Sequence, residues 1–592
     1  MVTFFEISPP TKLTKKRCND NIFLFSQFFV HSDEKRNDEI KFCLKNNVEN
    51  KFIHQIILLN ERIYTNEELG ITSEKIKQVD VKNRLKFSNI FNYVLQEKIK
   101  GYIVISNIDI FLTPELNRLQ MSDIHESKKM YSLLRYEYRG VENLKQSYLF
   151  GSYLSVLEFY KKENPEMYEK TLKDTSNSKN LLVQGARADS WDTWIIHSNY
   201  MLKEQEVRAF NFELGKLGCD NKMIYLFKIL GYEIYNDPLW IPTYHYHENQ
   251  NRDYTIKDRI PGPYGLYIPA RTVSDYTPSS LGVDIKTTLK DTNNLNDFLH
   301  FSNDNLKLFH YLKEKIEKNQ KFIIPRIAGE ENNFAFYTKM MVEGKIPNNV
   351  ETTKLLRYNV LKNNGGVKMS NFESAKRYSE QYFNAFNNCD MYTVWEPWGD
   401  VYRAIQNSHD YVTNTYKKDK VWAYTFDVYH FLHNPWTWGL SGKRLLIVSP
   451  FEESIKEKID NRKEIYGIDL FPGCEFVFIK PPQTQGDQES KEFYEELELF
   501  YKELDKMKDT FDIALCSCGG YGNLVCDYIY DKMDKSSIYV GGVLQMYFGI
   551  YGARWIRERQ DVLRIYLNQQ WSRPKETEKP KNFQKVEGSC YW

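Results

Sequence analysis

The sequence predicts an α/β protein built from two domains, and three observations lead to this fold class. A chain of 592 residues is too long for a single hydrophobic core. Strand-like and helix-like segments alternate over the first 270 or so residues, and a similar alternation begins again near residue 442. Between these regions, residues 272–294 are polar, rich in Thr, Ser and Asp, and without periodicity, which is typical of a linker.

The first domain is expected to cover residues 1–271. Residues 22–30 and 52–60 are apolar runs suited to buried parallel strands, with a helical stretch between them. A second helical stretch at about 81–100 leads into another apolar strand that begins at residue 102. This βαβαβ order places a ligand site at the carboxyl ends of the strands, and Asp109 lies at such an end.

The second domain is expected to cover residues 295–572. Residues 295–435 read as mostly helical, and strand-then-turn units follow from residue 442 onward. Residues 573–592 are charged and contain proline, which is typical of a tail that is either loose or docked.

Composition limits the classes of partner. The 80 basic and 79 acidic residues leave a formal net charge of +1, so the sequence shows no electrostatic footprint for nucleic acid. Nine cysteines without a CxxC pair favour reduced thiols in a cytoplasmic compartment, the host cytoplasm if the chain is viral. No run of about 18 apolar residues exists, so no transmembrane helix is expected, and contact with a membrane surface stays open.

The strongest chemical signal combines two acids and a late pair of histidines. Asp109 follows a strand, Asp220 opens a predicted helix, and His245 and His247 alternate on a strand-like segment so that they face the same side. Such groups could hold a divalent cation against a diphosphate and take a proton from an acceptor hydroxyl. The structural alternatives are a turn cap at Asp109, a helix N-cap at Asp220 and histidines that only pack.

Four blocks of sequence carry a family resemblance. SNIDIF, DSWDTWII, LGCDNKMIYLFKILGYEIYN and YHYHENQNRDY follow one another in the order found in glycosyltransferase-like domains with a GT-A type fold. Such domains occur in plants, giant viruses and bacteria, and the resemblance covers most of residues 20–265. The family's metal motif is usually Asp-x-Asp or a relative, whereas this chain has Asn107-Ile108-Asp109.

The resemblance implies a role for each matching residue. Asp109, with His245 or His247, would hold Mn²⁺ or Mg²⁺, and Asp220 would be the general base of an inverting transfer. The residues implied to bind the nucleotide-sugar donor are Asn107, Asp109, Asp189 and Asp192.

A glycine turn in the second domain provides another candidate site. Gly519, Gly520 and Gly522 lie between a buried strand and a helix, where backbone N–H groups can bind a phosphate. A dinucleotide fingerprint would require glycine at position 525, but Val525 is there, which favours a nucleotide-sugar diphosphate over NAD. The alternative is a tight connection that binds nothing.

This region resembles a bacterial and viral family related to GT-D type glycosyltransferases. The likeness covers about residues 320–560 and rests on LSGKRLLIVSPF, PPQT, the glycine turn and GGVLQMYFGIYGARW. It implies a catalytic role for Glu331, although Gly329 stands where the family's motif has Asp. It also implies that Gly542, Gln545 and Arg554 border the nucleotide, with surface solvation as the alternative for Arg554.

Together the two resemblances imply two nucleotide-sugar-binding Rossmann-like domains, GT-A-like then GT-D-like, in a bifunctional glycosyltransferase that acts on a glycan acceptor. One alternative is a single active GT-A transferase whose C-terminal domain is a non-catalytic glycan- or nucleotide-binding module. Another is a metal-dependent hydrolase, which the absence of HExxH and of a second ligand set disfavours.

Overall fold

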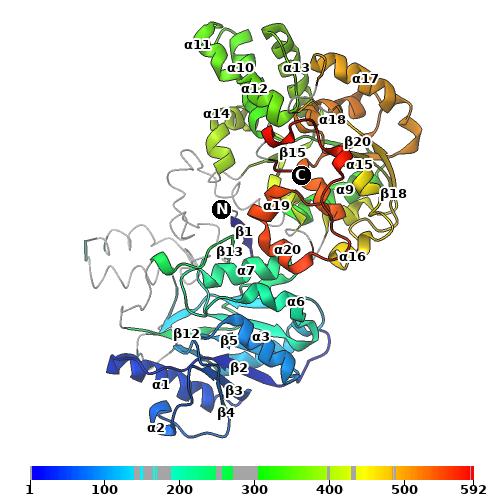
Figure 1. Ribbon diagram of the computed structural model, residues 1–592. Coiled ribbons are helices and arrows are strands. Elements are labelled where there is room, and N and C mark those ends of the chain that lie inside the picture. Colours follow the sequence, from blue (N-terminus) through cyan, green and yellow to red (C-terminus); the bar gives the residue numbers. More distant parts are fainter. Residues whose placement is uncertain are drawn as a thin grey trace. The chain divides into compact units, whose positions relative to one another are not determined.

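The computed structural model divides the chain into two compact units, Met1–Ser302 (unit 1) and Asn303–Trp592 (unit 2) (Figure 1). The expected linker, residues 272–294, lies outside the described residues. The structure describes residues 3–138, 140, 144, 147–150, 165, 166, 169, 189–248, 256–270, 304–395, 400–428, 432, 435–482, 484, 485, 489–586 and 589–592.

Unit 1 is built on a seven-stranded sheet in the order β11-β7-β10-β5-β2-β3-β4 (Figure 1). All neighbouring strands are parallel except β10, which runs antiparallel to both β5 and β7. The strands are β2 (Ile22–Ser26), β3 (Ile53–Asn60), β4 (Ile76–Asp80), β5 (Tyr102–Ser106), β7 (Lys129–Leu133), β10 (Thr193–His197) and β11 (Glu233–Tyr235).

The central strands are buried along their whole length. Every residue of β5, β7 and β10 is buried, as expected for strands covered on both faces. Val104, Tyr131 and Ile195 join one hydrophobic cluster that spans these three strands. The helices of unit 1 are α1 (Glu34–Glu49), α2 (Asn66–Leu69), α3 (Phe87–Gln96), α6 (Glu204–Val207) and α7 (Cys219–Ile229).

Two expected elements are shorter than predicted. The strand expected over residues 22–30 ends at Ser26, and the Phe28 N–H donates to the side chain of Asn60 at 2.8 Å instead of continuing the ladder. The helix expected over about 81–100 spans only Phe87–Gln96. Apolar residues beyond an element's end belong to the same core, so hydrophobicity alone overestimates its length.

Two smaller sheets complete unit 1. The first has the order β6-β12-β8-β9, and it brings His245 on β12 opposite Ile110 on β6 and Glu137 on β8. In the second, β1 and β13 pair in parallel. The strands are β6 (Ile110–Leu112), β8 (Tyr136–Tyr138), β9 (Tyr148–Leu149), β12 (Thr243–Tyr246), β1 (Thr3–Ile7) and β13 (Tyr264–Ile268).

Unit 2 contains a five-stranded, wholly parallel sheet in the order β14-β20-β19-β17-β18. Its strands are β14 (Ile323–Ile324), β17 (Arg444–Val448), β18 (Glu475–Ile479), β19 (Ile513–Cys516) and β20 (Ser536–Tyr539). A separate parallel pair is formed by β15 (Met391–Val394) and β16 (Asp419–Trp422).

The region expected to be mostly helical, residues 295–435, therefore also contains three strands in the part that the structure describes. β14 was not foreseen because it has two residues and ends before Pro325, which is too short for a periodic pattern. The helices of unit 2 are α9 (Asp304–Glu317), α10 (Gly329–Val342), α11 (Val350–Thr353), α12 (Tyr358–Val360), α13 (Phe372–Asn388), α14 (Asp400–Thr415), α15 (Glu452–Lys456), α16 (Arg462–Tyr466), α17 (Phe493–Asp505), α18 (Gly522–Asp531), α19 (Ala553–Glu558) and α20 (Gln560–Tyr566).

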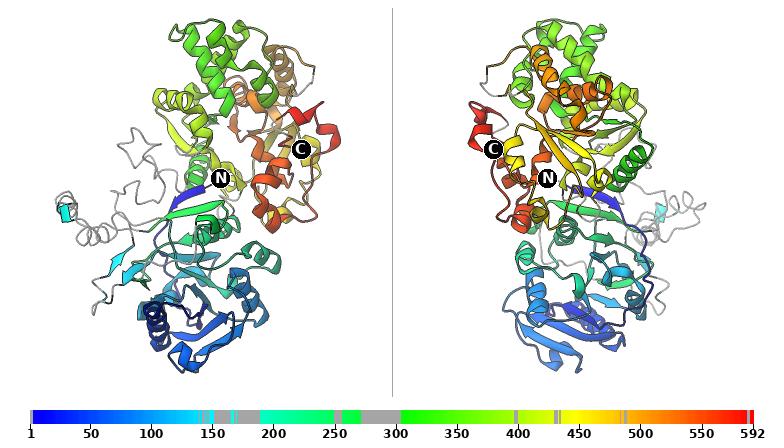
Figure 2. Two further views of the ribbon diagram at one scale, coloured as in Figure 1. Left: turned by 60° about the vertical axis from the view of Figure 1, so that its left-hand side comes forward. Right: turned by 90° about the vertical axis from the view of Figure 1, so that its right-hand side faces the viewer.

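The charged C-terminal segment is docked on unit 2, and both views in Figure 2 show it against the body of that unit. The Glu578 carboxylate accepts the backbone N–H groups of Glu453 (2.9 Å) and Ser454 (3.1 Å) at the start of α15. The ring of Trp592 packs on Phe451, and Glu578 and Trp592 are both buried. No helix in the described part of the chain combines the length and apolar character needed to cross a bilayer.

Candidate functional site

The polar residues of interest in unit 1 meet at one edge of the seven-stranded sheet. Asn107 follows the carboxyl end of β5, and Arg135 lies just beyond the carboxyl end of β7. Since β10 runs in the opposite direction and pairs Thr193 with both Ser106 and Leu133, Asp192 precedes β10 at this same edge. The strand order reverses between β2 and β5, and ligands bind beside such reversals in open α/β sheets.

Asp109, His245 and His247 form a cluster of metal-ligand type at this edge. One ligand atom from each of the three lies within 4.8 Å of the others. His245 Nε2 is 3.3 Å from Asp109 Oδ2, and His247 Nδ1 is 3.9 Å from the same oxygen. The backbone of Asp109, just before β6, is bonded to β12: the Tyr246 N–H donates to the Asp109 carbonyl at 2.9 Å.

Two buried polar atoms of the cluster have no hydrogen-bond partner among the described residues. They are Asp109 Oδ1 and His247 Nε2. Buried polar groups in folded proteins nearly always have partners, so these two atoms are suited to bind a ligand. A carboxylate oxygen and imidazole nitrogens suit a divalent cation, and the residues present fit one.

Charges around the cluster shift the pKa values of its members. Burial opposes the charged form of His245, but the carboxylates of Glu137 and Asp109 outweigh it and raise the pKa to about 9. Burial and the Arg36 guanidinium lower the pKa of His247 to about 4. For Asp109, burial favours the neutral acid, yet His245 and Arg36 hold the pKa well below its usual range.

Arg36 and Glu39 on α1 extend the cluster. Arg36 Nη2 donates to Asp109 Oδ2, and its Nη1 donates to Glu39 Oε2 at 2.7 Å. Both side chains are buried. Neither was foreseen, because the run Glu34–Glu39 is dense in charge and reads as a solvated helix face.

Asp220 lies in the first turn of α7, two positions after the N-cap. It was expected at or near the N-cap, and it lies near it; Gly218 occupies the N-cap itself with a φ of 80°. The left-handed backbone there suits glycine. Asp220 Oδ1 accepts the N–H of Asn221 at 2.9 Å, and Oδ2 accepts the N–H of Trp191 at 3.3 Å.

The pKa of Asp220 is raised to about 7. Burial is the main cause, the backbone N–H group of Asn221 opposes it, and the charges of Asp192 and Asp189 add to it. A carboxyl group with a pKa near neutrality can take up and release a proton under physiological conditions, which is what general base catalysis requires.

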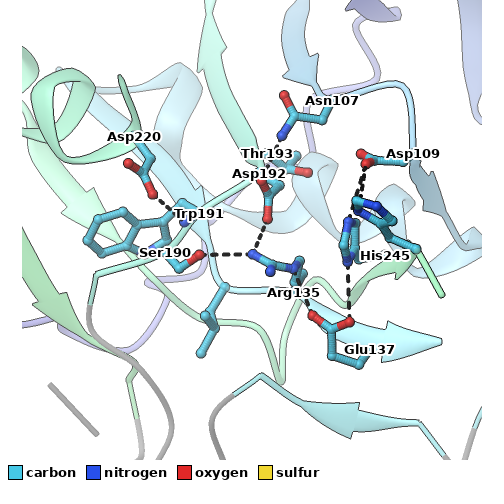
Figure 3. A network of polar contacts seen from close by, with 12 residues as sticks. Asn107, Asp109, Arg135, Glu137, Ser190, Trp191, Asp192, Thr193, Asp220 and His245 are labelled. Atoms are coloured by element: carbon cyan, nitrogen blue, oxygen red, sulfur yellow. Dashed lines mark hydrogen bonds and ion pairs between the residues drawn. The ribbon is translucent and has the colours of Figure 1, made fainter. Parts of the chain in front are cut away.

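A polar network joins the surroundings of Asp220 to the cluster (Figure 3). Arg135 donates from Nη1 to Asp192 Oδ2 and to Ser190 Oγ (2.9 Å), and from Nε to Glu137 Oε1 (2.9 Å). The other Glu137 oxygen lies 3.2 Å from His245 Nδ1. In Figure 3, Asp220 and Asp109 lie on opposite sides of Arg135.

Asn107 donates two hydrogen bonds to Asp192. Its backbone N–H donates to the Asp192 carbonyl at 3.1 Å, and its side-chain Nδ2 donates to Asp192 Oδ1 at 2.7 Å. The amide oxygen is therefore turned toward Gly215. Asp189, by contrast, is partly exposed, and its carbonyl accepts from Asn221 at 3.3 Å.

A second group of metal-ligand type in unit 1, Cys18, Asp20 and His197, lies at the opposite edge of the sheet, where His197 pairs with Tyr102. His197 Nδ1 accepts the N–H of Asn199 at 3.2 Å, so the neutral ring carries its proton on Nε2, which faces Asp20 Oδ2 at 3.1 Å. That nitrogen has no lone pair for a cation, and we assign no metal to this group.

In unit 2, the glycine turn lies at the carboxyl end of β19, beside the reversal of strand order between β17 and β19. Two tyrosine hydroxyls hold it: Tyr539 Oη donates to the Gly519 carbonyl (2.7 Å), and Tyr378 Oη donates to the Gly520 carbonyl (2.8 Å). A Cβ at Gly520 would lie 3.3 Å from Glu331 Cγ, so the structure brings Glu331 to this turn.

Three other expected residues of unit 2, Gly542, Gln545 and Arg554, lie around Tyr591. A Cβ at Gly542 would lie 2.4 Å from the Tyr591 ring, and Gln545 Nε2 donates to the Tyr591 carbonyl at 3.3 Å. Arg554 Nη1 donates to Tyr591 Oη at 3.4 Å. A Cβ at Gly522 would meet the Tyr539 ring at 2.3 Å, so this glycine permits close packing.

Comparisons with known proteins do not place the chain in a family. No protein-family model and no curated protein matches it. Among solved structures, it is similar to the mannosyltransferase PcManGT from Pyrobaculum calidifontis in complex with GDP-Man and Mn²⁺. The identity is 11%, the TM-score is 0.25, and the match covers 41% of this chain and 62% of that chain. A likeness at this level says nothing about activity.

Proposed function

We propose that unit 1 is a metal-dependent glycosyltransferase that moves a sugar from a nucleotide diphosphate donor to a hydroxyl of a glycan acceptor, with inversion. One observation carries the proposal. A cluster able to hold a divalent cation and a carboxyl group with a pKa of about 7 lie at the same edge of the sheet, beside the reversal of strand order. This transfer requires both groups.

Asp220 would act as the general base. Its carboxylate takes the proton of the acceptor hydroxyl as the acceptor oxygen attacks the anomeric carbon of the donor. A new carbon–oxygen bond forms on one face while the bond to the diphosphate breaks on the other, and the nucleoside diphosphate leaves with the bonding electrons. The pKa of about 7 suits this role, because the group is ionised at neutral pH yet basic enough to accept a proton.

Asp109, His245 and His247 would hold the cation, which when bound neutralises negative charge on the diphosphate. Two imidazoles and one carboxylate favour Mn²⁺ over Mg²⁺, because Mg²⁺ prefers oxygen ligands. Asn107, whose amide oxygen is turned away from Asp192, would accept a hydrogen bond from the donor. Asp192 would orient Asn107, and Asp189 would line the donor site.

For unit 2 we propose a second nucleotide-sugar site at the glycine turn. It is supported by the position of the turn beside the reversal of strand order and by the approach of Glu331 to Gly520. Under this proposal Glu331→Gln abolishes one of two transfer steps and Asp220→Asn abolishes the other. If Glu331→Gln and Gly519→Ala leave every step intact, unit 2 is a non-catalytic module.

The experiment is to incubate the whole chain with Mn²⁺ and a panel of nucleotide sugars, then measure released nucleoside diphosphate and protection against heat. We expect at least one donor to be consumed and to protect, and consumption of the donor that unit 1 uses to be lost in Asp220→Asn. The exposed Asp80, which ends β4 at the same sheet edge, provides the control Asp80→Asn. If no donor is consumed or protects, the proposal is wrong. Release of free sugar that persists with every acceptor offered would instead identify a hydrolase.

A further inference from the structure

Arg135 bonds two carboxylates, Asp192 and Glu137, which lie on the two sides of the unit 1 site. Its Nη1 donates to Asp192 Oδ2 and its Nε donates to Glu137 Oε1 at 2.9 Å. The side chain is buried, and the charges of Asp192 and Glu137 overcome burial to raise its pKa, so it is permanently charged.

Each of these carboxylates has a second bond that leads to a residue of the proposed site. On one side, Glu137 Oε2 faces His245 Nδ1 at 3.2 Å, which leaves His245 Nε2 directed at Asp109. A carboxylate on the far nitrogen of a ligating histidine fixes the tautomer and the ring orientation. On the other side, Asp192 Oδ1 accepts the Nδ2 of Asn107 at 2.7 Å.

Planar geometry makes arginine specific for this position. The guanidinium directs separate N–H groups at the two carboxylates at fixed angles, whereas a lysine ammonium at the end of a flexible stem would not hold both in one arrangement. The ring of Phe150 also covers the guanidinium, with 4.1 Å between Arg135 Cζ and the ring centroid.

We propose that Arg135 is a positioning residue that fixes the metal-binding orientation of His245 through Glu137 and the donor-binding orientation of Asn107 through Asp192. The proposal rests on the function proposed for unit 1. It adds that the guanidinium of Arg135 orients residues of both the metal site and the donor site, so that a change at Arg135 alters both.

The test is a Mn²⁺ titration of the whole protein, in which electron paramagnetic resonance reports the free ion. We expect Arg135→Met and Glu137→Gln to weaken Mn²⁺ binding by about 10- to 100-fold, the usual effect of losing an outer partner of a metal ligand. Arg135→Lys retains the charge and should recover part of the affinity. Arg135→Met, unlike Glu137→Gln, should also weaken binding of nucleoside diphosphate at saturating Mn²⁺.

Lys129 supplies a matched control. It is also a buried cation of unit 1 between two carboxylates, Asp123 and Glu233, but it begins β7 and so lies at the opposite edge of the sheet. Lys129→Met should lower the melting temperature as Arg135→Met does, without changing Mn²⁺ affinity.

Unchanged Mn²⁺ affinity in folded Arg135→Met and Glu137→Gln, with a wild-type protein that binds Mn²⁺, overturns the positioning role and leaves the proposed function standing. Loss of Mn²⁺ affinity in these variants, in a wild-type protein that consumes no nucleotide sugar, supports the positioning role and overturns the function. A wild-type protein that binds no Mn²⁺ overturns both.

Discussion

Asp220 is the residue whose chemistry the proposed reaction depends on most. Its carboxyl group must be ionised to accept a proton, and its pKa is about 7. We therefore expect kcat/KM to rise about tenfold per pH unit below 7 and to level off above it. Asp220→Asn should lower kcat by about 10²- to 10⁴-fold and leave donor binding in place. A flat pH profile between 5.5 and 8.5 would contradict the role of base.

The same residue makes stability depend on pH. In the unfolded chain its pKa is about 4, so between pH 4 and 7 the folded state binds the proton more tightly. The free energy of unfolding should therefore fall as pH rises through this window, by up to about 4 kcal/mol from this group. Asp220→Asn should remove that part of the slope, measured by urea denaturation at several pH values. An unchanged slope would show that Asp220 titrates normally.

Metal affinity should also depend on pH, in the opposite sense. His245 has a pKa of about 9 and must lose its proton to bind a cation through Nε2. Mn²⁺ binding should therefore tighten as pH rises from 6.5 to 8.5, and Mn²⁺ should bind better than Mg²⁺. Calorimetric titration at several pH values measures the affinities for both ions in wild-type protein and in His247→Ala. The exposed His310, changed to Ala, is the control. Equal affinity in His247→Ala would remove His247 from the ligand set.

At the scale of elements, the start of α7 positions Asp220. Gly218 has a φ of 80°, and a Cβ there would lie 3.3 Å from the Ile260 carbonyl and from the Tyr264 ring. Gly218→Ala should therefore cost about 1–2 kcal/mol in backbone strain, with added loss from crowding, and should lower kcat by displacing Asp220. Gly344 has a φ of 68° with nothing within 4 Å of its Cβ position, so Gly344→Ala isolates the strain in a denaturation measurement. If Gly218→Ala costs no more than Gly344→Ala and retains activity, this helix start does not position the base.

The elements also show what the sequence can predict. The apolar runs of β3, β5 and β17 were visible because strands buried on both faces are continuously hydrophobic. The two-residue β14 was not visible, since no pattern can repeat within it. Asp220 was expected at or near the N-cap because acids cap helices, and it lies in the first turn; the positive φ at the N-cap itself selects Gly218.

At the scale of the whole molecule, the sequence indicated Asp109 by its place after a strand and His245 and His247 by their alternation on a strand, and the structure brings one ligand atom of each within 4.8 Å of the others. It did not indicate Arg36, Arg135 or Glu137. Arg36 lies in a charge-dense helix, and Arg135 and Glu137 alternate with tyrosines as in a half-exposed strand. Arg36 pairs with Asp109, Arg135 with Asp192 and Glu137 with His245, at separations of 73, 57 and 108 residues, so only tertiary contacts show that these charges are buried and paired.

The most direct measurement is a crystal of the whole chain soaked with Mn²⁺ and a nucleoside diphosphate, with anomalous scattering used to locate the ion. We expect an anomalous peak bounded by Asp109 Oδ1, His245 Nε2 and His247 Nε2, with diphosphate oxygens completing its ligands and the nucleoside beside the carboxyl ends of β2 and β5. A protein that binds the nucleoside diphosphate elsewhere in unit 1, with no ion among these three side chains, would contradict the account.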